Sequence, residues 1–159
     1  MNKTHILKLL VSVAVPLGLG AIAGMFMAQP APGWYASLNK PSFNPPNWIF
    51  GPVWSVLYLL MGISLFLVWK QGAGKVRNLA ISIFLLQLLL NIAWCFIFFY
   101  FNRIGLALVI IILLWICIVL MLVLFYKIRP IASFINIPYL LWVTFAAVLN
   151  VGYYSLNHS

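Results

Sequence analysis

Residues 105–126 read GLALVIIILLWICIVLMLVLFY, an apolar stretch without a single charged side chain. At a rise of about 1.5 Å per residue, a helix of this length crosses the hydrocarbon core of a bilayer, which is about 30 Å thick. A helix that is apolar on every side is typical of a membrane span and not of a water-exposed surface. This stretch therefore predicts a transmembrane helix.

Four other stretches are similarly apolar and similarly long. The five predicted helices lie at residues 9–27, 48–69, 79–101, 105–126 and 133–156. The connections between the last four are short, so successive helices should be antiparallel neighbours. We interpret the first stretch as a retained helix, because it is longer than the apolar core of a typical signal peptide. The expected fold is an all-α integral membrane protein, a single domain over residues 1–159 made of a five-helix transmembrane bundle.

The composition of the whole chain points to the same class. Hydrophobic residues make up 66% of it, more than a water-soluble domain of 159 residues can bury. All nine charged residues are Lys or Arg, and both Asp and Glu are absent. Without side-chain carboxylates there is no Asp/Glu acid–base pair, no carboxylate-oriented triad and no oxygen cage for a hard cation. We therefore expect no cofactor, no metal site and no conventional acid–base or metal catalysis.

The basic residues are divided unequally between the two faces of such a bundle. One face holds the N-terminus and the connections at 70–78 and 127–132, with Lys3, Lys8, Lys70, Lys75, Arg77, Lys127 and Arg129. The opposite face holds Lys40 and Arg103. The positive-inside rule then predicts a cytoplasmic N-terminus and an external C-terminus. Because these cations are scattered between apolar spans, anionic lipid headgroups are favoured over nucleic acid as their partner.

The one long connection, at residues 29–47, combines prolines with aromatic residues. Its prolines are Pro30, Pro32, Pro41, Pro45 and Pro46, and its aromatic residues are Trp34, Tyr35 and Phe43. Proline fixes the backbone φ angle and removes a hydrogen-bond donor, so we expect a stiff, extended segment rather than a helix. We interpret the segment as a lid over the outer end of the bundle. The alternative is that Trp34 and Tyr35 are ordinary interfacial anchors.

Polar and aromatic residues repeat at helical spacing on three of the predicted helices. They are Trp48, Trp54 and Tyr58 in the second helix, Gln87, Asn91 and Trp94 in the third, and Tyr139, Trp142, Ala146 and Asn150 in the fifth. Amides in hydrocarbon need partners, so these stripes should face the interior. One interpretation is a mostly apolar small-molecule cavity beneath the lid. The other is interhelical hydrogen bonding that holds the bundle together.

Gly20 and Gly24 form a G-x-x-x-G pattern in the first predicted helix. Such a spacing is typical of helices that approach one another closely. It fits either the interface of a homodimer or close packing within one bundle, and the sequence favours neither.

Several short motifs, in order along the chain, are shared with one known family. They are Trp34-Tyr35, Leu38-Asn39-Lys40-Pro41, Pro45-Pro46, Trp48, Gly51-Pro52-Val53-Trp54, Asn91-Ile92-Ala93-Trp94, Arg103, Gly105-Leu106-Ala107-Leu108, Pro138-Tyr139-Leu140-Leu141-Trp142 and Phe145-Ala146. Through these motifs the chain resembles the translocator protein family, also called the tryptophan-rich sensory proteins or peripheral benzodiazepine receptors. Together they cover most of the chain.

The resemblance implies a membrane receptor, sensor or transporter that binds porphyrin-like tetrapyrroles, sterols or benzodiazepine-type ligands in a cavity closed by the first loop. We expect such a protein in a bacterial cell membrane. The residues that match the family's ligand site are Tyr35, Pro45, Trp54, Asn91, Trp94, Trp142 and Ala146. Family members have also been linked to light- and oxygen-dependent porphyrin breakdown. The alternative function is therefore an enzyme in which Trp54 and Trp142 are redox-active neighbours of the pigment.

Two departures from the family pattern bear on the ligand. The family commonly has an acidic residue in the fourth span, where this chain has Ile110. The family's sterol motif near the C-terminus requires a tyrosine closely followed by Lys or Arg, but Tyr153 and Tyr154 are followed only by His158. The sequence therefore favours a tetrapyrrole over a sterol as the ligand.

Overall fold

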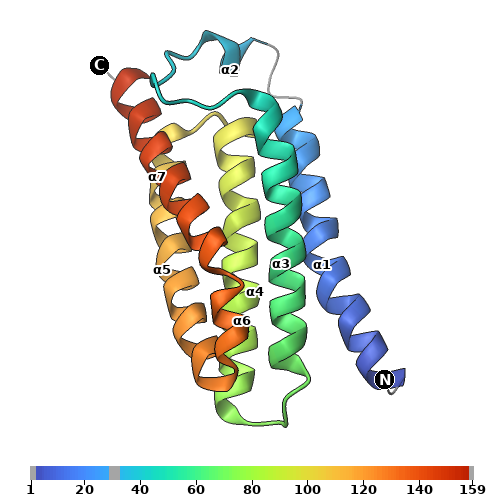
Figure 1. Cartoon of the computed structure of the whole chain (residues 1–159). Coiled ribbons are helices and arrows are strands. Elements are labelled where there is room, and N and C mark those ends of the chain that lie inside the picture. The colour runs from blue at the N-terminus through green and yellow to red at the C-terminus, as the bar shows by residue number, and fades with distance from the viewer. Residues whose placement is uncertain (1–2, 29–32, 158–159) are drawn as a thin grey trace.

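The computed structural model describes residues 3–28 and 33–157, which form a bundle of long helices (Figure 1). These are α1 (Lys3–Ala28), α3 (Phe50–Trp69), α4 (Lys75–Cys95), α5 (Ile104–Ile128) and α7 (Ile137–Asn157). Within the described ranges, five helical segments are long and apolar enough to cross a membrane, and no residue lies in a strand. The predicted fold class is confirmed: the chain is an integral, multi-pass membrane protein.

Short helical segments extend or connect the long helices. α2 (Trp34–Ser37) lies between α1 and α3, and the 3-10 turn η1 (Asn47–Ile49) leads into α3. The π-helix η2 (Phe96–Tyr100) continues α4, and α6 (Pro130–Phe134) precedes α7. Two of these segments differ from the prediction. α2 is a helical turn within the connection that was expected to be non-helical, and α6 begins before the last predicted span.

The last predicted span, at 133–156, is divided in two. α6 ends at Phe134, and α7 begins after a turn at residues 135–136. Pro138 has no N–H to donate to the carbonyl oxygen of Phe134, so a continuous helix would lose a backbone hydrogen bond at this point. The chain turns instead, and the N–H of Asn136 donates to the carbonyl oxygen of Ser133 at 3.0 Å.

The connection between α1 and α3 is less extended than expected. Gly33 has a left-handed φ of 92°, and the residues after it form the helical turn α2. The expectation of a non-helical segment is wrong for this turn, whose residues Trp34–Ser37 include no proline. The rest of the described connection contains no helix before η1, and residues 29–32 lie outside the described ranges.

α1 lies at one edge of the bundle, beside α3 (Figure 1). At Gly62 of α3, a Cβ atom would lie only 2.6 Å from the Cα atom of Val13 and 2.8 Å from the carbonyl oxygen of Ser12. The two backbones therefore touch at this point. Farther along α1, Gly20 packs against the ring of Tyr58, which leaves no space for a side chain. Gly20 thus serves packing within the bundle, and a homodimer stays a prediction.

The outer surface of the bundle is as apolar as its interior. Leu89 of α4 and Leu141 of α7 point outward and are each 64% exposed. Inside, the rings of Phe84 on α4 and Phe125 on α5 stack with their centroids 6.1 Å apart, and both are fully buried. An apolar interior beneath an apolar surface fits lipid rather than water as the surrounding medium.

The two ends of the bundle carry different connections. The N-terminal end of α1, the α3–α4 connection and the α5–α6 connection lie at one end, whereas α2 and the C-terminal end of α7 lie at the other (Figure 1). This arrangement groups the basic residues that the sequence assigns to one face. We propose, on that asymmetry, that this end of the bundle is cytoplasmic.

Cysteine labelling checks this orientation. Ser37 lies in α2 and Gly72 in the α3–α4 connection, so Ser37→Cys and Gly72→Cys report the two ends of the bundle. A Cβ atom at Gly72 meets no atom within 4 Å, so the new side chain fits. With Cys95→Ala and Cys117→Ala as background, an impermeant thiol reagent should modify only Ser37→Cys in intact cells. Gly72→Cys should react only after permeabilisation, and modification of both sites from one side would contradict the five-span arrangement.

Candidate ligand-binding site

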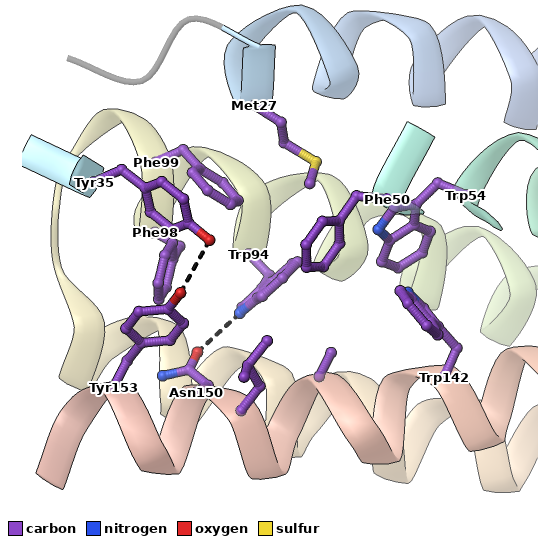
Figure 2. Close-up of a pocket in the computed structure, with 12 residues that line it drawn as sticks. Met27, Tyr35, Phe50, Trp54, Trp94, Phe98, Phe99, Trp142, Asn150 and Tyr153 are labelled. Atoms are coloured by element: carbon purple, nitrogen blue, oxygen red, sulfur yellow. Dashed lines mark hydrogen bonds between the residues drawn. The ribbon is translucent and has the colours of Figure 1, made fainter. Parts of the chain in front are cut away.

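Aromatic side chains from α2, α3, α4, η2 and α7 converge beneath the lid, which we define as residues 33–46 (Figure 2). They enclose a small space, here called the aromatic cavity, of about 30 Å³. Its lining consists of Met27, Tyr35, Phe50, Trp54, Trp94, Phe98, Phe99, Trp142, Ala146, Leu149, Asn150 and Tyr153. A space of this size holds about one water molecule. In this conformation the cavity therefore has no room for a larger ligand.

Most of the residues that match the family's ligand site meet at this cavity. Those that line it are Tyr35, Trp54, Trp94, Trp142 and Ala146. Asn91 does not line it, and its buried side chain bonds to Tyr58 and Tyr139 instead. Pro45 lies in the lid, where its carbonyl oxygen accepts a hydrogen bond from the side chain of Asn44 at 3.2 Å, and it does not line the cavity either. Ligand contacts for Asn91 and Pro45 stay predictions.

Two tryptophans line the cavity at the same end, Trp54 from α3 and Trp142 from α7 (Figure 2). Trp54 stacks on Tyr58, with ring centroids 5.5 Å apart and an interplanar angle of 27°. Trp142 packs edge-on against Phe50 at 5.9 Å. The indole N–H of Trp142 is buried and has no hydrogen-bond partner within the described residues. A buried donor without a partner costs about 1–3 kcal/mol, so a water molecule or a ligand acceptor at this point would be stabilising.

Trp94 is held in place by hydrogen bonds that run through Asn150. Its indole N–H donates to the side-chain oxygen of Asn150 at 3.0 Å, and the Asn150 amide donates to the carbonyl oxygen of Ile104 at 3.1 Å. This group joins α4, α7 and the start of α5 beside the cavity. Asn150 thus positions the wall formed by Trp94.

Below the cavity, a buried hydrogen-bonded network joins α3, α4 and α7. The hydroxyl of Tyr58 donates to the side-chain oxygen of Asn91, and the Asn91 amide donates to the hydroxyl oxygen of Tyr139 at 3.2 Å. The Tyr139 hydroxyl donates onward to the side-chain oxygen of Gln87 at 2.7 Å. For Gln87 and Asn91, the interpretation as interhelical hydrogen bonding therefore describes the structure.

The lid is fastened to α7 by side-chain hydrogen bonds. The hydroxyl of Tyr153 donates to the side-chain oxygen of Asn44 at 2.8 Å, and the hydroxyls of Tyr35 and Tyr153 lie 3.0 Å apart. Asn39 and Asn157 exchange two bonds, from the Asn39 N–H at 2.9 Å and to the Asn39 carbonyl oxygen at 3.0 Å. The lid is therefore a fixed part of the α7 side of the bundle.

The π-helix η2 supplies two ring contacts that the sequence did not indicate. Phe98 packs edge-on against Trp34 of the lid at 5.8 Å, and Phe99 packs against Tyr35 at 5.6 Å. π-helical turns are rare and often occur at functional sites. Sequence patterns did not single out Phe98 and Phe99, because both lie within a continuous apolar run.

A larger cavity lies between α1 and α3, here called the α1–α3 groove. Its volume is about 700 Å³, and it shares Met27, Tyr35, Phe50, Trp54 and Phe99 with the aromatic cavity. The remaining lining residues are Leu17, Gly20, Ala21, Ala23, Gly24, Asn47, Trp48, Gly51, Ser55 and Tyr58. Small-molecule sites usually measure about 300–1,000 Å³, so this groove has the volume that the aromatic cavity lacks. Its small α1 residues were missed as site residues, since their spacing indicated only helix packing.

Comparison with known proteins agrees with this architecture. The model of the TspO/MBR family matches residues 12–155, which include α3, α4 and α5, most of α1 and α7, and all the residues that line the aromatic cavity. The chain belongs to the TspO/MBR family. The family resemblance inferred from the sequence motifs is thereby confirmed.

Individual TspO/MBR relatives cover most of the chain. It is 40% identical over 154 residues to a tryptophan-rich protein TspO of Archaeoglobus fulgidus, covering 96% of this chain and 99% of the relative. It is 40% identical over 127 residues to the human translocator protein, covering 79% and 75% of the two chains. A tryptophan-rich sensory protein of Cereibacter sphaeroides is 34% identical over 125 residues, covering 78% and 77%.

The Tyr139 network gives a prediction for stability. Tyr139→Phe keeps the ring but deprives Gln87 and Asn91 of a buried partner, so it should lower the free energy of unfolding by about 1–3 kcal/mol. Thr144→Val is the matched control, because Thr144 accepts a bond from Trp115 at 2.8 Å on an exposed face. Its loss should be smaller, about 0.6 kcal/mol, the average for hydrogen bonds in membrane proteins. Unfolding in detergent micelles measures both, and equal losses would contradict a network that holds the three helices together.

Proposed function

We propose that this chain is a membrane receptor or sensor that binds a porphyrin-like tetrapyrrole at the aromatic cavity. Its membership of a family whose members are named translocator and sensory proteins supports the receptor or sensor role. The observation that carries the ligand assignment is the convergence of Tyr35, Trp54, Trp94 and Trp142 on one enclosed space. Aromatic rings in this arrangement match the face and edges of a flat, largely apolar macrocycle.

Binding of a tetrapyrrole would require more space than the aromatic cavity offers in this conformation. The aromatic cavity measures about 30 Å³ and the adjoining α1–α3 groove about 700 Å³. A tetrapyrrole is far larger than one water molecule, so the rings between the two spaces must move apart to admit it. Phe50, Trp54 and Phe99 are among the five side chains that line both spaces, and displacement of their rings would join the two.

Two polar groups suit the substituents of such a ligand. The indole N–H of Trp142 lines the cavity without a partner and can donate to a ligand acceptor. The Lys40 ammonium lies over the Tyr35 ring, 4.6 Å from its centroid, at the lid. Because the chain contains neither Asp nor Glu, Lys40 has no side-chain carboxylate to pair with. A carboxylate on the edge of a porphyrin would provide one.

A second candidate function is light- and oxygen-dependent breakdown of the pigment. It is favoured by the position of Trp54 and Trp142, because both indoles line the space in which the pigment would lie. Loss of the pigment's absorbance under light and oxygen, dependent on the protein, separates an enzyme from a receptor that only binds.

The tryptophan walls give the main prediction for binding. Trp54→Leu and Trp142→Leu each remove a buried ring, which should weaken protoporphyrin binding by about 1–3 kcal/mol, or about ten- to a hundredfold in Kd. Trp115→Leu is the control, since Trp115 is bonded to Thr144 on α7 and lines neither cavity. Quenching of the remaining tryptophan fluorescence measures each Kd. Equal affinities in three folded variants would remove the aromatic cavity as the site.

The absence of carboxylates gives a prediction for pH. Asp and Glu carboxylates have pKa values of about 4, and burial can raise these to about 6 or above, but this chain has no Asp or Glu. His5 lies near the start of α1, away from the cavity, and His158 lies outside the described residues. The Kd of a neutral ligand should therefore be nearly constant between about pH 4 and 6. A steep acidic transition in a protein that stays folded would contradict the proposed site.

A further inference from the structure

The α1–α3 groove has an aromatic side and a side of small residues. The aromatic side is formed by Trp48 and Trp54, and the opposite side by Ala21 and Gly24 of α1, while Gly20 and the Tyr58 ring touch where the two sides meet. Rings on one side and bare backbone on the other leave a slot that suits a flat molecule. Ala21 is exposed, and Trp48 is 74% exposed. The slot therefore opens onto the outside of the bundle, where the surrounding medium is the bilayer.

The groove side of the site is joined by fewer hydrogen bonds than the lid side. On the lid side, the Tyr153–Asn44 and Asn39–Asn157 hydrogen bonds join the lid to α7. On the groove side, α1 and α3 pack closely, as Gly20 does on the Tyr58 ring, but within the described residues no hydrogen bond joins α1 after Pro16 to another helix. Separating α1 from α3 at the groove breaks none of the hydrogen bonds that fasten the lid.

α1 also contains a point at which its outer half can move. Pro16 lies inside the helix and cannot donate a hydrogen bond to the carbonyl oxygen of Ser12. Ser12 and Val13 are the residues that touch α3 at Gly62. This backbone-to-backbone contact therefore lies before Pro16, whereas every groove residue of α1 lies after it. Proline interrupts helical hydrogen bonding and is a common cause of helix bending.

We propose that the α1–α3 groove is itself a ligand site, which receives the flat apolar ligand from the bilayer and passes it to the aromatic cavity. This inference rests on the proposed function, because it concerns the same class of ligand. Continuity supports it: five side chains line both spaces, among them Trp54 and Phe50. The groove holds the ligand volume, and the aromatic cavity provides the inner walls.

A plug in the groove tests the proposal. Gly24 lines the groove and a Cβ atom there meets no atom within 4 Å, so the Gly24→Leu side chain can start from this position and occupy the groove. Gly18→Leu is the matched control, because Gly18 lies on the same helix with equally open space and does not line the groove. Ala21→Leu, at an exposed groove position, repeats the test at a second site. The probe is protoporphyrin mixed with protein in lipid nanodiscs, followed by stopped-flow quenching of tryptophan fluorescence.

The expected result separates the groove from the aromatic cavity. Gly24→Leu and Ala21→Leu should slow association by about tenfold or more, as expected when binding must wait for a conformational change, and Gly18→Leu should associate like the parent. Wild-type rates and Kd in both folded plug variants would overturn the groove assignment but leave the proposed function standing. An equal loss in Gly18→Leu would also overturn it. Absence of saturable quenching in the parent would overturn the proposed function itself.

Pro16→Ala tests the moving part separately. The substitution restores a donor for the Ser12 carbonyl oxygen and should stiffen α1 at the point where its outer half departs from α3. Association and dissociation should then slow by the same factor, with the Kd unchanged. The substitution alters how easily α1 moves away from α3, but not the residues that contact the ligand. Rates equal to those of the parent would overturn the assignment of Pro16 as the hinge.

Discussion

The hydroxyl of Tyr139 holds the centre of the bundle together. It lies between the amides of Gln87 and Asn91, and Asn91 accepts from Tyr58, so one hydrogen-bonded chain joins α3, α4 and α7. The sequence has no Asp or Glu, so its interior polar contacts cannot be ion pairs between side chains. Neutral hydrogen bonds carry this role, because polar groups within hydrocarbon have no water as an alternative partner. The cavity wall depends on the network directly, since Trp54 stacks on Tyr58.

Hydropathy alone predicted the fold, because a bilayer demands long apolar helices and the chain offers five. The tryptophan walls were also predictable, since Trp54 and Trp142 belong to motifs at helical spacing. Phe98 and Phe99 were not predictable, because in a continuous apolar run nothing distinguishes a cavity-lining ring from one that faces lipid. Their placement depends on the π-helix η2, which has no signature in hydropathy. Asn91 was ambiguous for a different reason: an amide beside a tryptophan suits a ligand contact and an interhelical bond equally well.

Hydrogen bonds join the helices on one side of the site, and the other side, formed by α1, lacks them after Pro16 within the described residues. α3, α4 and α7 are joined by buried hydrogen bonds, and the lid is bonded to α7 through Tyr153, Asn39 and their partners. α1 stands outside this framework and presents glycine and alanine to the α1–α3 groove. A rigid aromatic wall with one movable neighbour can stay closed when empty and still admit a large flat ligand, because opening leaves the network intact. This division explains how a cavity of about 30 Å³ can belong to a ligand site.

The central claim is that the ligand reaches the aromatic walls from the α1 side while the lid stays fastened to α7. A Cβ atom at Gly152 would lie 3.2 Å from the Cβ atom of Pro41, a few tenths of an ångström below the range of about 3.5–4.5 Å found in disulfides, so a small backbone shift lets Pro41→Cys with Gly152→Cys lock the lid. The decisive measurement is the quenching of tryptophan fluorescence by protoporphyrin in this double variant, oxidised and reduced, with Cys95→Ala and Cys117→Ala as background. The account predicts saturable quenching with the same Kd in both states. Loss of binding on oxidation, restored by reduction, would contradict it.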